Sequence, residues 1–131
     1  MTLLLDTSVL IAIEKKEAHI KEKLNQIRKQ HQTIPAISLI TYTEMITGYK
    51  KREIKNQEKA IGFLNNFTFL PATKETATIL ANLKYTYDQK GNTPSLADLF
   101  IAAQAKEHHL TLITKDKDFE RIDEIDKIIL A

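Results

Sequence analysis

The chain of 131 residues contains no cysteine and no tryptophan, and it has only three glycines and three prolines. The lack of cysteine excludes disulfide frameworks, zinc–thiolate sites and cysteine nucleophiles. No apolar run approaches the roughly 18 residues that span a bilayer. The opening residues lack a basic flank and soon reach Asp6, which does not fit a secretory signal peptide. We therefore expect a soluble, cytoplasmic protein that does not associate with membranes, and its length fits one domain over residues 1–131.

The charge of the chain is nearly balanced but unevenly distributed. Nineteen Lys and Arg against seventeen Asp and Glu give a net charge of +2. Residues 1–60 carry eleven basic and seven acidic side chains, a net +4, whereas residues 61–131 carry eight and ten, a net −2. This balance permits a nucleic-acid partner without requiring one, since electrostatic nucleic-acid binders are usually far more basic. The asymmetry indicates a basic surface beside an acidic site.

Short apolar runs alternate with amphipathic helical patterns along the whole chain. The predicted strands are 3–5, 33–38, 67–70, 111–113 and 128–130, and the predicted helices are 8–15, 20–30, 42–49, 60–67, 76–90 and 96–107, with a helical turn at 118–122. Strands that alternate with helices pair in parallel, in a sheet covered by helices on both faces. The sequence therefore predicts an α/β fold.

Four carboxylates stand close to the predicted ends of strands. Asp6 follows the first strand directly, and Glu44 lies in the first turn of the helix after the second strand. Asp98 lies in the first turn of the helix over 96–107, and Asp116 follows the strand over 111–113. In an open parallel sheet such positions share the carboxyl edge, where ligand sites form. The four acids converge on one crevice if the strands before Asp6 and Asp116 are neighbours.

Each acid taken alone also has a purely structural interpretation. Glu44 and Asp98 stand three residues after a Thr or Ser, the pattern of a capping box. Asp6 and Asp116 can serve as N-caps, each stabilising a helix by about 1 kcal/mol. Several carboxylates in one crevice are harder to explain in this way, because like charges about 4 Å apart repel by roughly 4 kcal/mol at an effective dielectric constant near 20. Such a group should either bind protons or bind a cation.

The expected cation is a hard one. The chain has no cysteine, and its four histidines lie outside the segments that carry these acids, so the available ligands are oxygen atoms. Oxygen-only sites suit Mg²⁺ or Mn²⁺ and argue against zinc.

A basic group lies close to Glu44 in the sequence. Glu44, Gly48 and Lys51 are spaced to share one helix face, and the neighbouring cations are Lys50, Arg52 and Lys55. Glycine inside a helix costs about 1 kcal/mol relative to alanine, and one use for Gly48 is to let a backbone or ligand approach closely. Cations that lead away from an acidic crevice would attract a phosphate backbone. An ordinary solvated helix face explains the same pattern equally well.

Four segments carry the acids: LLLDTSVLI at 3–11, ITYTEMITG at 40–48, PSLADLFIAAQA at 94–105 and LTLITKDKDFERI at 110–122. Together they resemble the PIN-domain ribonuclease family, in particular its VapC-like toxin branch. The resemblance implies a three-layer α/β/α domain with a small parallel sheet in the strand order 3-2-1-4-5.

The resemblance also implies roles for individual residues. Asp6, Asp98 and Asp116 would be the principal ligands of one or two Mg²⁺ or Mn²⁺ ions, and Glu44 would complete the catalytic site. Hydroxyl groups that would orient ligands by hydrogen bonds belong to Ser8, Thr7 and Thr114. The final motif offers both Asp116 and Asp118; Asp116 is nearer the strand end and is preferred, with Asp118 in support.

The function implied by the resemblance is metal-dependent hydrolysis of RNA phosphodiester bonds. A VapC-like protein would act on single-stranded or looped RNA, form a homodimer and be silenced by a small antitoxin protein. The same acids would serve an RNA-processing PIN nuclease without a toxin role, and a non-catalytic RNA- or protein-binding PIN module is a further alternative. A signalling receiver domain fits poorly, because it needs an aspartate after its third strand and the sequence has none between Asp6 and Asp88.

Overall fold

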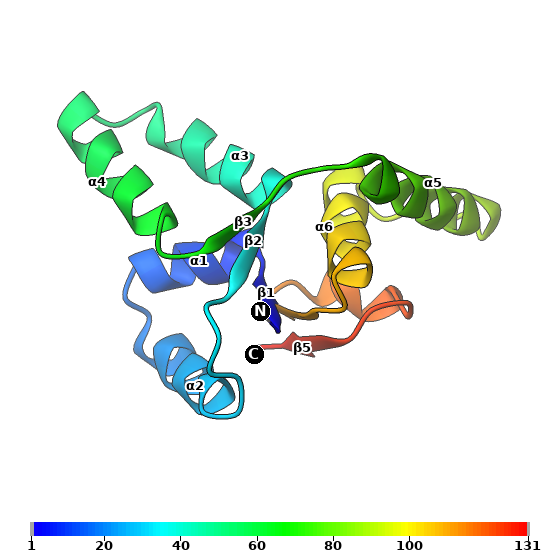
Figure 1. The fold of residues 1–131 in the computed structure, drawn as a ribbon, viewed down its shortest axis with the longest axis horizontal. Helices are drawn as coiled ribbons and strands as arrows, with labels where there is room; N and C mark the ends of the chain where they lie inside the picture. The colour runs from blue at the N-terminus through cyan, green and yellow to red at the C-terminus, as the bar shows by residue number, and fades with distance from the viewer. Residues whose placement is uncertain (1, 131) are drawn as a thin grey trace.

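The computed structural model describes residues 2–130 and contains a five-stranded parallel sheet in the order β3-β2-β1-β4-β5 (Figure 1). The strands are β1 (Leu3–Leu5), β2 (Ala36–Ser38), β3 (Thr68–Leu70), β4 (Thr111–Thr114) and β5 (Lys127–Ile129). The helices are α1 (Thr7–Glu14), α2 (Ala18–Arg28), α3 (Leu39–Tyr49), α4 (Ile54–Leu64), α5 (Lys74–Gln89) and α6 (Leu96–Glu107), followed by the short 3₁₀ helix η1 (Lys117–Arg121). The predicted α/β class and strand order are confirmed.

The sheet separates two hydrophobic clusters, because successive strand side chains point to opposite faces. Leu4 and Leu112 pack against α5 and α6, whereas Leu3, Leu5 and Ile113 pack against helices α1 to α4. Figure 1 shows the same division, with α1 to α4 on one side of the sheet and α5 and α6 on the other. The run Leu3–Leu5 is buried on both faces, as the central strand of a three-layer fold requires.

Three predicted elements differ from the structure by three residues or more at one end or both. The strand predicted over 33–38 is reduced to β2, and Pro35 before it has no N–H to donate to a neighbouring strand. Helix α3 begins at Leu39 and not near Tyr42, because Ser38 caps it by accepting a hydrogen bond from Ile40 N at 3.1 Å. Helix α4 covers Ile54–Leu64, so it begins earlier than the predicted 60–67.

The parallel register brings the ends of β1, β2 and β4 to one edge of the sheet. Leu5 pairs with Ile37 on one side and with Ile113 on the other. Asp6 and Thr114 therefore lie at this carboxyl edge, and Leu39 opens α3 beside them. No helix within residues 2–130 combines the length and the apolar composition needed to cross a membrane.

Candidate functional site

Asp6 is the buried centre of a hydrogen-bond network at the carboxyl edge, with only 5% of its surface exposed. Its Oδ1 accepts a bond of 2.7 Å from Thr7 N, so Asp6 is the N-cap of α1. Its Oδ2 accepts bonds from Ser8 Oγ at 2.8 Å and from Thr114 Oγ1 at 2.6 Å. Each carboxylate oxygen has two lone pairs, so Oδ1 keeps one lone pair free for a further ligand.

Ser8 and Thr114 connect Asp6 by hydrogen bonds to the loop that carries Asp116 and Asp118. Ser8 Oγ accepts a bond of 3.0 Å from Lys115 N, and Thr114 Oγ1 accepts one of 2.9 Å from Asp116 N. These two hydroxyls therefore cross-link the end of β1 to the end of β4. The structure places both hydroxyls beside Asp6, and their role in orienting ligands stays a prediction.

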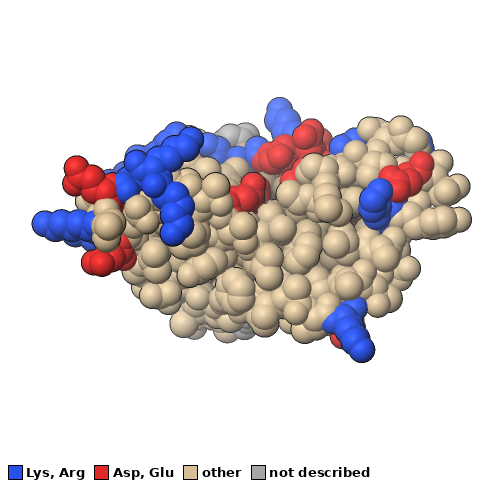
Figure 2. Space-filling model, turned by 90° about the horizontal axis from the view of Figure 1, so that it is seen from above, with Lys and Arg blue, Asp and Glu red and all other residues tan. Residues whose placement is uncertain are grey.

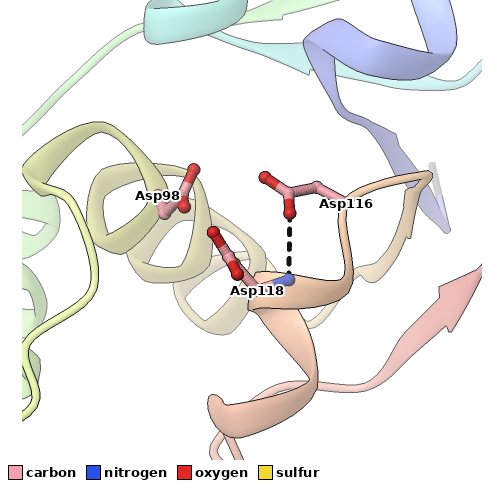
Figure 3. Close-up of side chains that lie close together, drawn as sticks. All are labelled: Asp98, Asp116 and Asp118. Atoms are coloured by element: carbon pink, nitrogen blue, oxygen red, sulfur yellow. Dashed lines mark hydrogen bonds between the residues drawn. The ribbon is translucent and has the colours of Figure 1, made fainter.

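Three further carboxylates gather beside this network (Figure 3). Asp98 comes from the first turn of α6, and Asp116 and Asp118 come from the start of η1. One carboxylate oxygen from each lies within 4.8 Å of the other two. Asp116 Oδ1 also accepts a bond of 2.9 Å from Asp118 N, so Asp116 is the N-cap of η1. Asp6 and Asp116 are thus helix caps and still belong to a convergent acidic site.

The convergence changes the acidity of Asp98. Burial, followed by the charges of Asp116, Asp6 and Asp118, raises the pKa of Asp98 from 3.8 to about 6, against a lowering hydrogen bond from Ser95. The carboxylates of Asp6 and Asp116 are thus close enough to Asp98 to disfavour its ionised form. A divalent cation would remove this cost, and a set of carboxylate oxygens is the donor set that Mg²⁺ or Mn²⁺ prefers. Asp98, Asp116 and Asp118 fit such an ion, with Asp6 beside them.

Glu44 lies outside the three-carboxylate group and is held by Thr7. It was predicted in the first turn of its helix, but α3 begins at Leu39, so Glu44 stands in the second turn. Its Oε1 accepts a bond of 2.7 Å from Thr7 Oγ1, which also lies 3.1 Å from Thr41 Oγ1. The capping box suggested for Glu44 does not form, and its carboxylate is joined to the residue that follows Asp6.

The predicted basic group is exposed, but it does not form one helix face. Lys50 caps the end of α3 and Lys51 and Arg52 follow it, while Lys55 lies in α4. Figure 2 shows cationic groups over the side of the molecule where α3 and α4 lie, with acidic groups near the middle of the same face. The predicted shared face of Glu44, Gly48 and Lys51 is therefore wrong, because α3 ends before Lys51.

Arg52 and Gly48 both differ from what the sequence predicted for them. Arg52 lies 3.5 Å from Glu14 Oε2 and 4.7 Å from the centre of the Tyr49 ring, so its guanidinium group is partly engaged within the chain. A Cβ added at Gly48 meets no atom within 4 Å, so this glycine serves no close approach in the described residues.

Sequence reasoning missed two buried polar side chains near the site. Thr41 was considered only as a capping residue, and Gln104 received no role, yet both are fully buried. The sequence signal for Gln104 was its place as the single polar residue inside the apolar run Ile101–Ala105.

Comparisons with known proteins agree with this architecture. Ribonuclease VapC1 of Rickettsia felis is 30% identical over 138 aligned positions, which cover 100% of this chain and 98% of the relative. Ribonuclease VapC2 of Haemophilus influenzae is 28% identical over 123 positions, with coverages of 91% and 90%.

Solved structures give the same picture. DNA-bound VapBC from Salmonella typhimurium matches with a TM-score of 0.82 and 26% identity over 98% of both chains. VapBC2 from Rickettsia felis, bound to a DNA fragment from its promoter, has a TM-score of 0.85 and 24% identity over 100% of both chains, which supports the fold. The model of the PIN domain family matches residues 3–125. The chain therefore belongs to the PIN domain family.

Proposed function

We propose that this chain is an endoribonuclease that depends on Mg²⁺ or Mn²⁺, acting over residues 1–131 as a single PIN-like domain. The observation that carries the proposal is the meeting of Asp98, Asp116 and Asp118 within 4.8 Å beside the buried Asp6. The two relatives above are named as ribonucleases, which supports RNA as the substrate. A non-catalytic binding module is less favoured, because it would not need to gather mutually repelling carboxylates.

The proposed ligands act from opposite sides of the site. Asp98 approaches from α6, Asp116 and Asp118 approach from η1, and Asp6 offers the free lone pair of Oδ1. When bound, a divalent cation supplies water of lowered pKa and positive charge beside the phosphodiester bond. Of the two aspartates at the start of η1, Asp116 is the preferred acid of the catalytic site, and Asp118 supports it.

Glu44 has a different proposed role. Its Oε1 is fixed by Thr7, and the remaining lone pairs of its exposed carboxylate are free to orient an attacking water molecule and accept its proton. Thr7, Ser8 and Thr114 act as orienting residues, because their hydroxyl groups hold the carboxylates in place. Water serves as the nucleophile, so no side chain needs to form a covalent bond with the substrate.

The exposed cations Lys50, Lys51 and Lys55 are proposed to guide the RNA backbone toward the acids. Single-stranded or looped RNA is the preferred substrate, because its bases are accessible. Arg52 contributes less, since Glu14 already pairs with it.

The direct test incubates the purified chain with mixed RNA and Mn²⁺. We expect fragments from the unsubstituted protein, and intact RNA with EDTA or with Asp6→Asn. Asp126→Asn is the matched control, since it removes one exposed carboxylate next to the start of β5 and should cleave normally. Intact RNA in every sample, with tight binding that does not need metal, would instead establish the binding module.

We further propose that the chain is the toxin of a VapBC-type pair. The two solved structures reported above are of VapBC complexes, which supports an antitoxin partner. Growth arrest on induced expression that Asp6→Asn abolishes is the expected result. A nuclease that cleaves RNA in vitro without arresting growth would favour an RNA-processing role. We also propose that the chain forms a homodimer, which the molar mass of the isolated chain from light scattering would check.

A groove of about 780 Å³ beside β1 and α2 suits a segment of that antitoxin. Apolar side chains such as Leu5, Leu24 and Phe67 line it together with three cations, and its single acid, Glu17, is already paired with Lys115. The lining favours a segment that combines apolar and acidic residues. The three cations of the groove are Lys16, Lys21 and Arg28, and its lining also includes the exposed Ile34.

This groove can be tested with a matched pair of surface substitutions. Ile34→Glu should weaken co-purification with a short antitoxin encoded next to the gene. Ile54→Glu, at an exposed position on α4 outside the groove, should not weaken it. Equal retention of the antitoxin by both variants would place its segment elsewhere.

A further inference from the structure

Gln104 is a fully buried amide whose polar atoms are all used. Its Oε1 accepts a bond of 3.2 Å from Leu39 N, and its Nε2 donates to Leu70 O at 3.0 Å and to Pro71 O at 3.3 Å. The opposite orientation of the amide would set its NH₂ group against Leu39 N–H and its oxygen against two carbonyls. The orientation of the side chain is therefore fixed by its surroundings.

These bonds connect α6 to the beginning of α3. Leu39 N is the first amide of α3, one of the four that a helix leaves without an internal partner. Ser38 caps the second amide, that of Ile40, so the first turn is held by one local acceptor and one remote acceptor. The remote acceptor comes from Gln104, on the helix that also carries Asp98.

The start of α3 determines where Glu44 lies. Because α3 begins at Leu39, Glu44 stands in the second turn, where its carboxylate reaches Thr7 Oγ1 at 2.7 Å. Thr41, fully buried in the intervening turn, lies 3.1 Å from the same Thr7 hydroxyl. A helix that began at Thr41 would place Glu44 in its first turn, where its carboxylate could return to the helix's own amide.

We propose that Gln104 is a positioning residue that fixes the Glu44 helix relative to the Asp98 helix. The substrate-facing side chains are Glu44 and Asp98, and Gln104 acts only through them. The catalytic consequence rests on the proposed nuclease function, whereas the anchoring of α3 does not.

The distribution of buried polarity supports this role. Among residues 2–130, six polar or charged side chains are buried, and five of them belong to the site or to the start of α3. They are Asp6, Ser38, Thr41, Gln104 and Thr114, and the sixth is Thr76. Thr76 bonds to Glu107 Oε1 at 2.6 Å near the other end of α6, so it is a matched control for the loss of a buried hydrogen bond.

The first experiment measures anchoring without activity, by hydrogen–deuterium exchange. In Gln104→Met, we expect exchange over residues 39–44 to rise about 10-fold, because a first-turn amide loses its acceptor. Exchange over α4 should not change. Thr76→Val should leave 39–44 as protected as in the unsubstituted protein. Unchanged protection of 39–44 in Gln104→Met would overturn the anchoring.

The second experiment measures RNA cleavage, well below the melting temperature of each variant. Gln104→Met should lower kcat by about 10-fold through displacement of Glu44, with little change in KM, whereas Thr76→Val should retain kcat. In a Glu44→Gln background, Gln104→Met should have almost no further effect, since both changes remove the same function. Equal losses of kcat in the two backgrounds would overturn the proposed action through Glu44.

Gln104→Glu separates positioning from stability. Its carboxyl oxygen can still accept from Leu39 N–H, but an ionised carboxylate faces the carbonyl groups of Leu70 and Pro71. We expect a lower melting temperature with retained kcat, and a kcat that instead falls in proportion to stability would contradict positioning. If the unsubstituted chain cleaves no RNA, the nuclease proposal fails, while the exchange experiment still decides the anchoring.

Discussion

Replacing Asp98 by asparagine should stabilise the metal-free protein at neutral pH. Asp98 Oδ atoms face the carboxylates of Asp116 and Asp118, and burial adds to the cost of its negative charge. Asparagine has nearly the same shape and carries no charge. The substitution therefore removes both the repulsion and the cost of burying the charge, at the expense of a cation ligand.

The expected gain is modest. Two unit charges 4.8 Å apart repel by roughly 3.5 kcal/mol at an effective dielectric constant near 20. Asp118 is exposed and Asp98 is only partly buried, so screening by solvent reduces the gain to about 1 kcal/mol. For a chain of this size, that corresponds to a rise of about 3 °C in melting temperature.

The gain should depend on pH in a defined direction. The pKa of Asp98 is about 6 in the folded protein against the ordinary 3.8, so the folded state binds this proton more tightly than the unfolded chain. Proton binding by Asp98 therefore stabilises the folded state. This contribution to the free energy of unfolding is fully present below pH 3.8 and is lost as the pH rises through 6. Asp98→Asn should therefore match the unsubstituted protein at low pH and exceed it at neutral pH.

Thermal unfolding in EDTA checks this prediction, with scans on both sides of the pKa of Asp98. Adding Mn²⁺ should then raise the melting temperature of the unsubstituted protein well above that of Asp98→Asn. Asp126→Asn serves as the control for general removal of negative charge. An equal or lower melting temperature for Asp98→Asn at neutral pH in EDTA would refute the repulsion on which the argument rests.

Three other substitutions give separate tests. Thr114→Val removes two hydrogen bonds at the site and should cost about 2 kcal/mol in urea unfolding; an unchanged midpoint would contradict this. His109 has a φ of 54°, so His109→Gly should gain about 1 kcal/mol, whereas His108→Gly, at a φ of −101°, should not. Lys50→Gln should lower the salt slope of RNA binding by about 0.7; an equal drop for Arg52→Gln would mean that Arg52 also contacts phosphate.

The parts of the fold that could be predicted from the sequence are those that local patterns determine. Leu3–Leu5 forms a buried strand because three consecutive leucines fit a sheet covered on both faces. The helix over 96–107 begins after Ser95, whose hydroxyl caps it, and both boundaries match the prediction. The positions of Asp6 and Asp116 at the carboxyl edge follow from strand ends alone.

The beginning of α3 could not be predicted in this way, because one of its caps is remote. Gln104, which accepts from Leu39 N, is separated from it by 65 positions along the chain. The local pattern from Thr41 to Glu44 instead favoured a later start. Likewise, no local signal shows that Arg52 meets Glu14, a contact that requires α1 and α3 to pack together.

Binding of Mn²⁺ to the purified chain tests the central claim most directly, with free Mn²⁺ measured by electron paramagnetic resonance. We expect saturable binding that Asp98→Asn and Asp116→Asn each abolish and that Asp126→Asn leaves intact. RNA cleavage should rise in step with the bound Mn²⁺. Full cleavage of RNA in EDTA, or Mn²⁺ binding that survives the loss of both aspartates, would contradict a metal-dependent site at these carboxylates.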